Sequence, residues 1–64
     1  MDWLGFLRLM LLDEKAARAK YELAAGLAQD LQVKAVLERL RDEEAVHADI
    51  LEGEHARLEK LLNR

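Results

Sequence analysis

Apolar residues recur at intervals of three and four along almost the whole chain, and this spacing is typical of long amphipathic helices. The pattern is interrupted once, after Gly26, where Asp30 stands directly before a new apolar run and is suited to cap a helix. We therefore predict a helix over about residues 2–27, a turn over 28–30 and a second helix over 31–62. The expected fold is all-α, an antiparallel two-helix hairpin that forms a single domain.

Each predicted helix carries one apolar stripe, and acidic or imidazole side chains interrupt both stripes. The stripe of the second helix consists of Val33, Leu37, Leu40, Glu44, His47, Leu51, His55, Leu58 and Leu62. The stripe of the first helix consists of Trp3, Leu7, Met10, Glu14, Ala17, Tyr21, Ala25 and Ala28. The polar residues in these stripes are candidates for a function, because a packed face otherwise favours leucine.

Folding the hairpin brings two of these acids to one height. Glu14 and Glu44 are each fifteen residues from Gln29 in the turn, so at ~1.5 Å rise per residue both lie roughly 22 Å from it. His47 follows Glu44 by three residues and therefore points to the same side of its helix. The sequence thus predicts a cluster of two carboxylates and one imidazole between the helices.

His55 is a separate feature. It lies eleven residues beyond Glu44, roughly 16 Å along the axis, and is level with Trp3. We expect it to pack near Trp3 and to bond Glu52 or Glu59. A second metal site at His55 and Trp3 is the less favoured alternative.

Composition and charge exclude several classes of function. The chain has 64 residues, no cysteine, no proline and a formal net charge of −3, with acidic and basic residues interleaved. Without a basic face it is not expected to bind nucleic acid, and without cysteine it has no disulfides. The apolar opening WLGFLRLMLL covers about ten residues, short of the ~20 that cross a bilayer, so no membrane span or targeting signal is expected.

A single hairpin cannot cover both sides of its own apolar stripes. The start of the first helix is apolar on most sides, through Leu4, Phe6, Leu9 and Leu12, and the second helix extends past the first from about residue 57. We expect two copies to pair into a four-helix bundle, a homodimer that assembles further.

Carboxylates and imidazole without thiolate suit iron, manganese or zinc. Glu14, Glu44 and His47 from two chains would supply four carboxylates and two imidazoles, which balance two divalent cations. Two ionised glutamates at one level repel each other in a packed interior, and a metal removes that penalty. Metal is therefore expected to drive or tighten the dimer.

Two structural alternatives use the same residues without a metal. Arg18 lies four residues after Glu14 and Arg41 three before Glu44, so a buried ion-pair network is one alternative, although we expect both arginines at the rim of the cluster. A polar layer that fixes the register of a helical oligomer is the other. Tyr21 is either core packing or a hydrogen-bond donor near the ligands.

The order Glu14, Tyr21, turn and then DLQVKAVLERLRDEEAVHA, which contains Glu44 and His47, resembles the encapsulated ferritin family. More broadly, it is similar to half of a rubrerythrin-type ferritin-like domain. The resemblance runs from about Asp13 to Ala48. It implies a ferroxidase whose di-iron centre forms between two subunits, with dimers arranged in a ring, inside an encapsulin nanocompartment of the cytoplasm.

The resemblance also assigns roles to residues. Glu14, Glu44 and His47 would be the iron ligands, with Glu14 or Glu44 bridging, Tyr21 beside them and Asp13 guiding iron entry. The family's second entry acid corresponds to Ala16, and the chain ends in LEKLLNR without a Gly/Ser/Leu-rich targeting tail. The expected function is Fe(II) oxidation for storage or detoxification. A rubrerythrin-like peroxidase and a metal-free oligomerisation module remain as alternatives.

Overall fold

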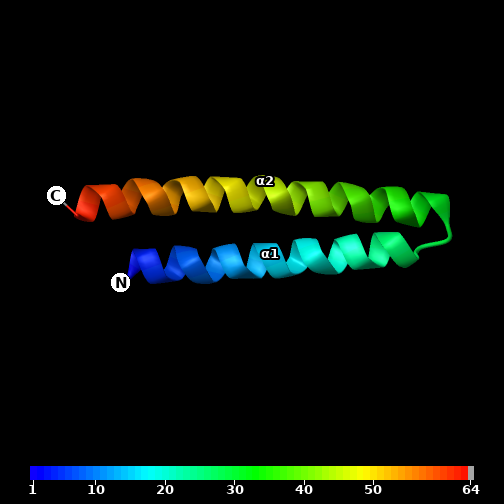
Figure 1. Ribbon diagram of the computed structural model, residues 1–64, viewed down its shortest axis with the longest axis horizontal. Coiled ribbons are helices and arrows are strands. Elements are labelled where there is room, and N and C mark those ends of the chain that lie inside the picture. Colours follow the sequence, from blue (N-terminus) through cyan, green and yellow to red (C-terminus); the bar gives the residue numbers. More distant parts are fainter. Residues whose placement is uncertain (64) are drawn as a thin grey trace.

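The computed structural model describes residues 1–63 and consists of two antiparallel helices (Figure 1). Helix α1 covers Trp3–Leu27 and helix α2 covers Leu31–Leu62, and no strand occurs in residues 1–63. The molecule measures 52 × 14 × 14 Å, so it is a rod one layer deep. The prediction of an all-α hairpin is confirmed.

Aspartate side chains begin both helices. Asp2 Oδ1 accepts a hydrogen bond of 2.9 Å from the amide of Gly5, and Asp30 Oδ1 accepts one of 2.9 Å from the amide of Val33. Each bond satisfies an amide that has no partner within its helix. Gly26 lies within α1, which ends at Leu27, so the position of the turn is indicated better by Asp30, the N-cap of α2, than by the glycine.

Replacing Asp30 with alanine is expected to lower the free energy of unfolding by about 1 kcal/mol, because the cap of α2 is lost. Urea denaturation measured by helical circular dichroism tests this. Asp30→Ser is the matched control, since a serine oxygen also caps, and it should retain most of the stability. Equal losses in the two variants would contradict the capping role.

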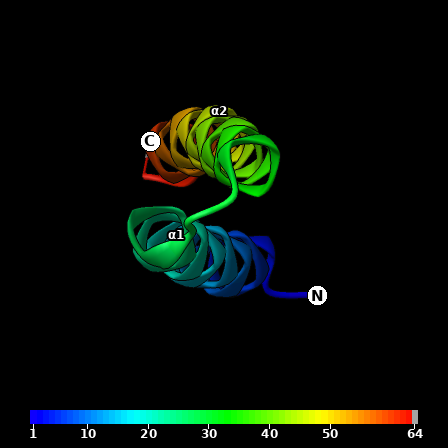
Figure 2. The same cartoon turned by 90° about the vertical axis from the view of Figure 1, so that its right-hand side faces the viewer.

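The seam between the helices buries little. Only Ala25 and Ala48 are buried among the described residues, at 3% and 7% exposure. Larger residues that face the seam are half-buried: Leu4, Leu7, Met10, Leu11, Tyr21, Leu37, Leu40, Leu51 and Leu58. An end-on view shows two helices side by side, each with faces that the other helix does not contact (Figure 2). No helix within residues 1–63 is long and apolar enough to span a membrane.

Three apolar residues that we predicted in the packed stripes are exposed instead. Leu62 is 64% exposed because α1 begins at Trp3 and has no residue at the level of the end of α2. Val33 is 51% exposed, on a side of α2 that α1 does not cover. Trp3 is 55% exposed and packs edge-on against Phe6, with ring centroids 5.7 Å apart.

Candidate metal centre

The structure brings Glu14, Glu44 and His47 together midway along the rod. Glu14 comes from α1, and Glu44 and His47 lie one turn apart on α2. One potential ligand atom from each side chain lies within 4.8 Å of the other two. Glu14 and Glu44 are equally far from the turn along the sequence, and this spacing predicted that the antiparallel helices would bring the three residues together.

His47 is the outermost member of the cluster. Its Nδ1 lies 3.4 Å from Glu14 Oε2 and 3.9 Å from Glu44 Oε2. The side chain of His47 is 54% exposed, against 27% for Glu14 and 19% for Glu44. The prediction that His47 lies on the packed face is thus wrong for an isolated hairpin. The imidazole stands at the edge of the seam with the carboxylates behind it.

One carboxylate oxygen in the cluster lacks a hydrogen bond. Glu14 Oε2 is buried and has no hydrogen-bond partner among residues 1–63, although the His47 imidazole lies within ion-pair distance of it. A buried carboxylate oxygen without a donor is costly, because it has lost water and gained no replacement. A cation is the species that would offset this cost.

The spacing of the ligand atoms fits a divalent transition metal. Bonds of about 2.0–2.2 Å to nitrogen and carboxylate oxygen place neighbouring ligand atoms roughly 3–3.5 Å apart. The 3.4 Å separation of His47 Nδ1 from Glu14 Oε2 lies in this range, and the 3.9 Å separation from Glu44 Oε2 is slightly wider. One imidazole and two carboxylates suit iron, manganese or zinc better than magnesium or calcium.

Three protein ligands would leave further coordination positions on a bound metal open. Comparisons with family models, curated proteins and solved structures find no match to this chain. The resemblance to encapsulated ferritins therefore depends on the ligand spacing alone.

The two nearby arginines do not neutralise the glutamates. Arg41 donates to Asp42 Oδ1 at 3.0 Å, and this hydrogen bond is the main cause of the raised pKa of Arg41, with Glu38 and Glu22 adding to it. Within residues 1–63 no ion pair joins Arg41 to Glu44, and none joins Arg18 to Glu14. The alternative of a buried ion-pair network is therefore wrong for the described chain.

Asp42 is the residue that sequence reasoning missed here. It follows Arg41 directly, and neighbouring residues on a helix do not ordinarily face each other. The long arginine side chain nevertheless reaches back to it, and the ion pair measures 3.0 Å. This pairing holds Arg41 beside Asp42 and leaves the two glutamates to another cation.

Tyr21 and Asp13 lie near the cluster without joining it. Tyr21 is half-buried, seven residues and therefore about 10 Å along α1 from Glu14, too far for direct contact with a shared ion. Its hydroxyl forms no hydrogen bond within the described residues. Asp13 is exposed beside Glu14 in the sequence.

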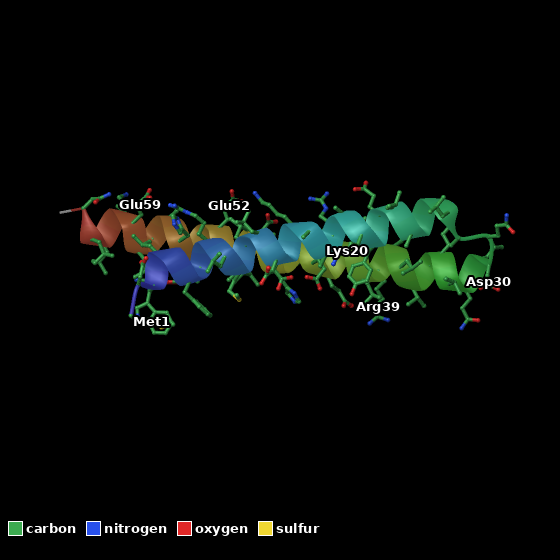
Figure 3. The ribbon with its side chains drawn as sticks, turned by 90° about the horizontal axis from the view of Figure 1, so that it is seen from below. Met1, Lys20, Asp30, Arg39, Glu52 and Glu59 are labelled. Carbon is green, nitrogen blue, oxygen red and sulfur yellow. The ribbon has the colours of Figure 1, made fainter. Side chains whose placement is uncertain are left out.

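His55 is separate from the cluster, and its expected hydrogen bond is absent. Its Nε2 is buried without a partner, and no ion pair joins it to Glu52 or Glu59 in residues 1–63. Figure 3 shows Glu52 and Glu59 pointing to one flank of the hairpin and Arg39 to the opposite flank. The predicted bond to Glu52 or Glu59 is therefore wrong, because both side chains point into solvent.

Proposed function

We propose that two hairpins pair on the side that carries His47 and form a di-iron ferroxidase centre between them. The observation that carries this proposal is the buried, unpartnered Oε2 of Glu14 beside Glu44 and His47. Each chain supplies two carboxylates and one imidazole, so the pair offers four negative charges to two Fe(II). Within residues 1–63 no arginine forms an ion pair with Glu14 or Glu44, which supports a metal as their counter-charge.

The surface around His47 supports pairing on this side. At ~100° per residue, the following apolar residues fall within about 40° of His47 around α2. They are Val33, Val36, Leu40, Leu51, Leu58 and Leu61. Three of them are about half exposed: Val33 at 51%, Val36 at 49% and Leu61 at 49%. Covering this face with a second copy buries apolar surface and shields the exposed imidazole from water.

The residues of the centre bind and orient the substrate. The two copies of Glu14 and of Glu44 would together neutralise two Fe(II), with Glu14 or Glu44 shared between the ions, and each copy of His47 would hold an ion against α2. The apolar surroundings exclude bulk water, which strengthens these electrostatic interactions. Two Fe(II) give up one electron each, and O2 takes both electrons and two protons to become hydrogen peroxide. Fe(III) then leaves towards a store outside the pair of hairpins. The resemblance to encapsulated ferritins makes an encapsulin shell the proposed partner for that storage.

Anaerobic titration with Fe(II), followed by admission of air, tests the proposed activity. We expect saturation near one iron per chain and oxidation faster than in buffer, because the paired sites hold the two ions side by side. Binding is followed by calorimetry and oxidation by absorbance of Fe(III).

The two histidines of α2 provide a matched pair of variants for this titration. His47→Gln should lose both the stoichiometric binding and the faster oxidation. His55→Gln removes the same type of side chain about 12 Å along the helix and should keep both. Absence of stoichiometric binding in the unaltered chain, or equal losses in the two variants, would count against the ferroxidase.

A further inference from the structure

Helix α1 carries a second apolar stripe, on the side away from α2. This outer stripe consists of Leu9, Leu12, Ala16, Ala19, Leu23 and Leu27. Its four leucines are 61%, 58%, 68% and 74% exposed, in chain order. At ~100° per residue the stripe occupies a sector of about 80°, opposite the buried Ala25 and Glu14. Neither α2 nor the proposed iron-binding pair covers it.

The outer stripe has the spacing of a helix-pairing surface. Its members follow one another at steps of three and four, with leucines towards both ends and alanines in the middle. Such a stripe packs on a second helix, and the small central residues let two helix axes approach closely. If two copies of α1 lie antiparallel, Leu12 meets Leu23 of the second copy and Ala16 meets Ala19.

Charges along the edges of the outer stripe favour this antiparallel arrangement. Asp13 and Lys20 lie along one edge, and Lys15 and Glu22 lie along the other; all four are exposed. In the antiparallel pair Asp13 faces Lys20 of the second copy and Lys15 faces Glu22, so every edge pair is of opposite sign. A parallel pair would instead set Lys15 against Lys20. Figure 3 views the hairpin from the α1 side, where Lys20 is labelled.

A shallow hollow in the surface fits the same register. It is lined by residues at the start of α1, among them Gly5, Phe6, Leu9 and Leu12. In the antiparallel pair Leu27 of the second copy lies level with this hollow. Leu27 is 74% exposed in the single chain and gains an apolar site there.

We propose that the outer stripe binds the outer stripe of a second copy of this chain, antiparallel and about a two-fold axis. The contact is distinct from the pairing that builds the iron centre, since it uses the opposite face of α1. A chain with both contacts joins iron-binding dimers to one another. Each dimer carries two outer stripes, so the assembly grows as a closed ring or as a chain of dimers.

Variants of Leu23 test this contact in the full chain, with mass measured by sedimentation velocity in the presence of Zn(II). The unaltered chain is expected to sediment as a multiple of the dimer. Leu23→Glu places a charge against Leu12 of the second copy and should reduce the mass to that of the dimer, with zinc still bound at one ion per chain. Val46→Glu is the matched control, since Val46 is 57% exposed on α2, and it should leave the mass unchanged.

A compensating variant tests the direction of the pairing. Leu12→Lys combined with Leu23→Glu sets opposite charges together in an antiparallel pair and should restore the higher mass. A parallel pair would set like charges together, so no recovery would overturn the proposed arrangement. An unaltered chain that stays a dimer with zinc, or a mass unchanged by Leu23→Glu, would overturn the contact itself. The contact through the outer stripe is also expected without metal. Loss of this contact can therefore be distinguished from a failure of the iron centre, which affects only the metal-loaded chain.

Discussion

Glu14→Gln is expected to abolish stoichiometric iron binding while leaving the metal-free hairpin folded. The substitution keeps the size of the side chain and removes the charge of the carboxylate whose Oε2 is buried without a hydrogen-bond partner in residues 1–63. Changing a residue that only supports a metal ligand costs about 10–100-fold in affinity, so loss of a ligand should cost at least roughly a hundredfold. Calorimetric titration with anaerobic Fe(II) measures it.

The metal-free stability of the same variant separates a metal site from a structural polar layer. Glu14 and Glu44 carry like charges within 4.8 Å of the imidazole and of each other, so removing one relieves repulsion. Because both side chains are partly exposed, at 27% and 19%, the gain should be about 0–1 kcal/mol. A register-fixing layer predicts no effect of metal on either protein, and this outcome would contradict the proposal.

Much of the hairpin could be predicted because its determinants are local. The three- and four-residue spacing defines both helices, and Asp30 marks the start of the second through a bond within its own first turn. The proximity of Glu14 to Glu44 and His47 could be predicted as easily, since a short turn between two antiparallel helices determines which residues lie at the same height. Only the position of the turn and the rise per residue were needed.

The remaining features depend on side-chain directions that spacing does not determine. Helical position placed His47 on the packed face, but its imidazole stands at the edge of a seam only two helices wide. Arg41 was expected to screen the glutamates from the rim of the cluster, and its pairing with Asp42 was not predicted, because a flexible side chain can reach several acids. For His55, a stripe position predicted burial but gave no partner for its Nε2. The apolar spacing of one chain also does not distinguish a helix face that packs within the hairpin from a face that packs on a second copy.

Metal is expected to raise the thermal stability of this chain and to increase its assembly size. A ligand present at a hundred times its dissociation constant stabilises the folded state by about 2.7 kcal/mol. For a domain of this size each 1 kcal/mol moves the melting temperature by roughly 4–8 °C, so Zn(II) or anaerobic Fe(II) should raise it by about 10–20 °C. Thermal melts by circular dichroism measure the shift, and magnesium at equal concentration is the control, because the imidazole and carboxylate set disfavours it.

The same metal effect should appear as a change in mass, since a site shared by two chains binds tightly only when they are paired. Leu23→Glu provides the clearest background, because it removes the contact through the outer stripe. In that variant the metal-free chain is expected to be a monomer and the metal-loaded chain a dimer by sedimentation velocity. Adding Glu44→Gln to Leu23→Glu should leave a monomer with or without metal, since Glu44 is the least exposed of the three proposed ligands, at 19%, and solvent cannot replace it in the seam. A melting temperature and mass that do not depend on metal would show that Glu14, Glu44 and His47 meet for a reason other than metal binding.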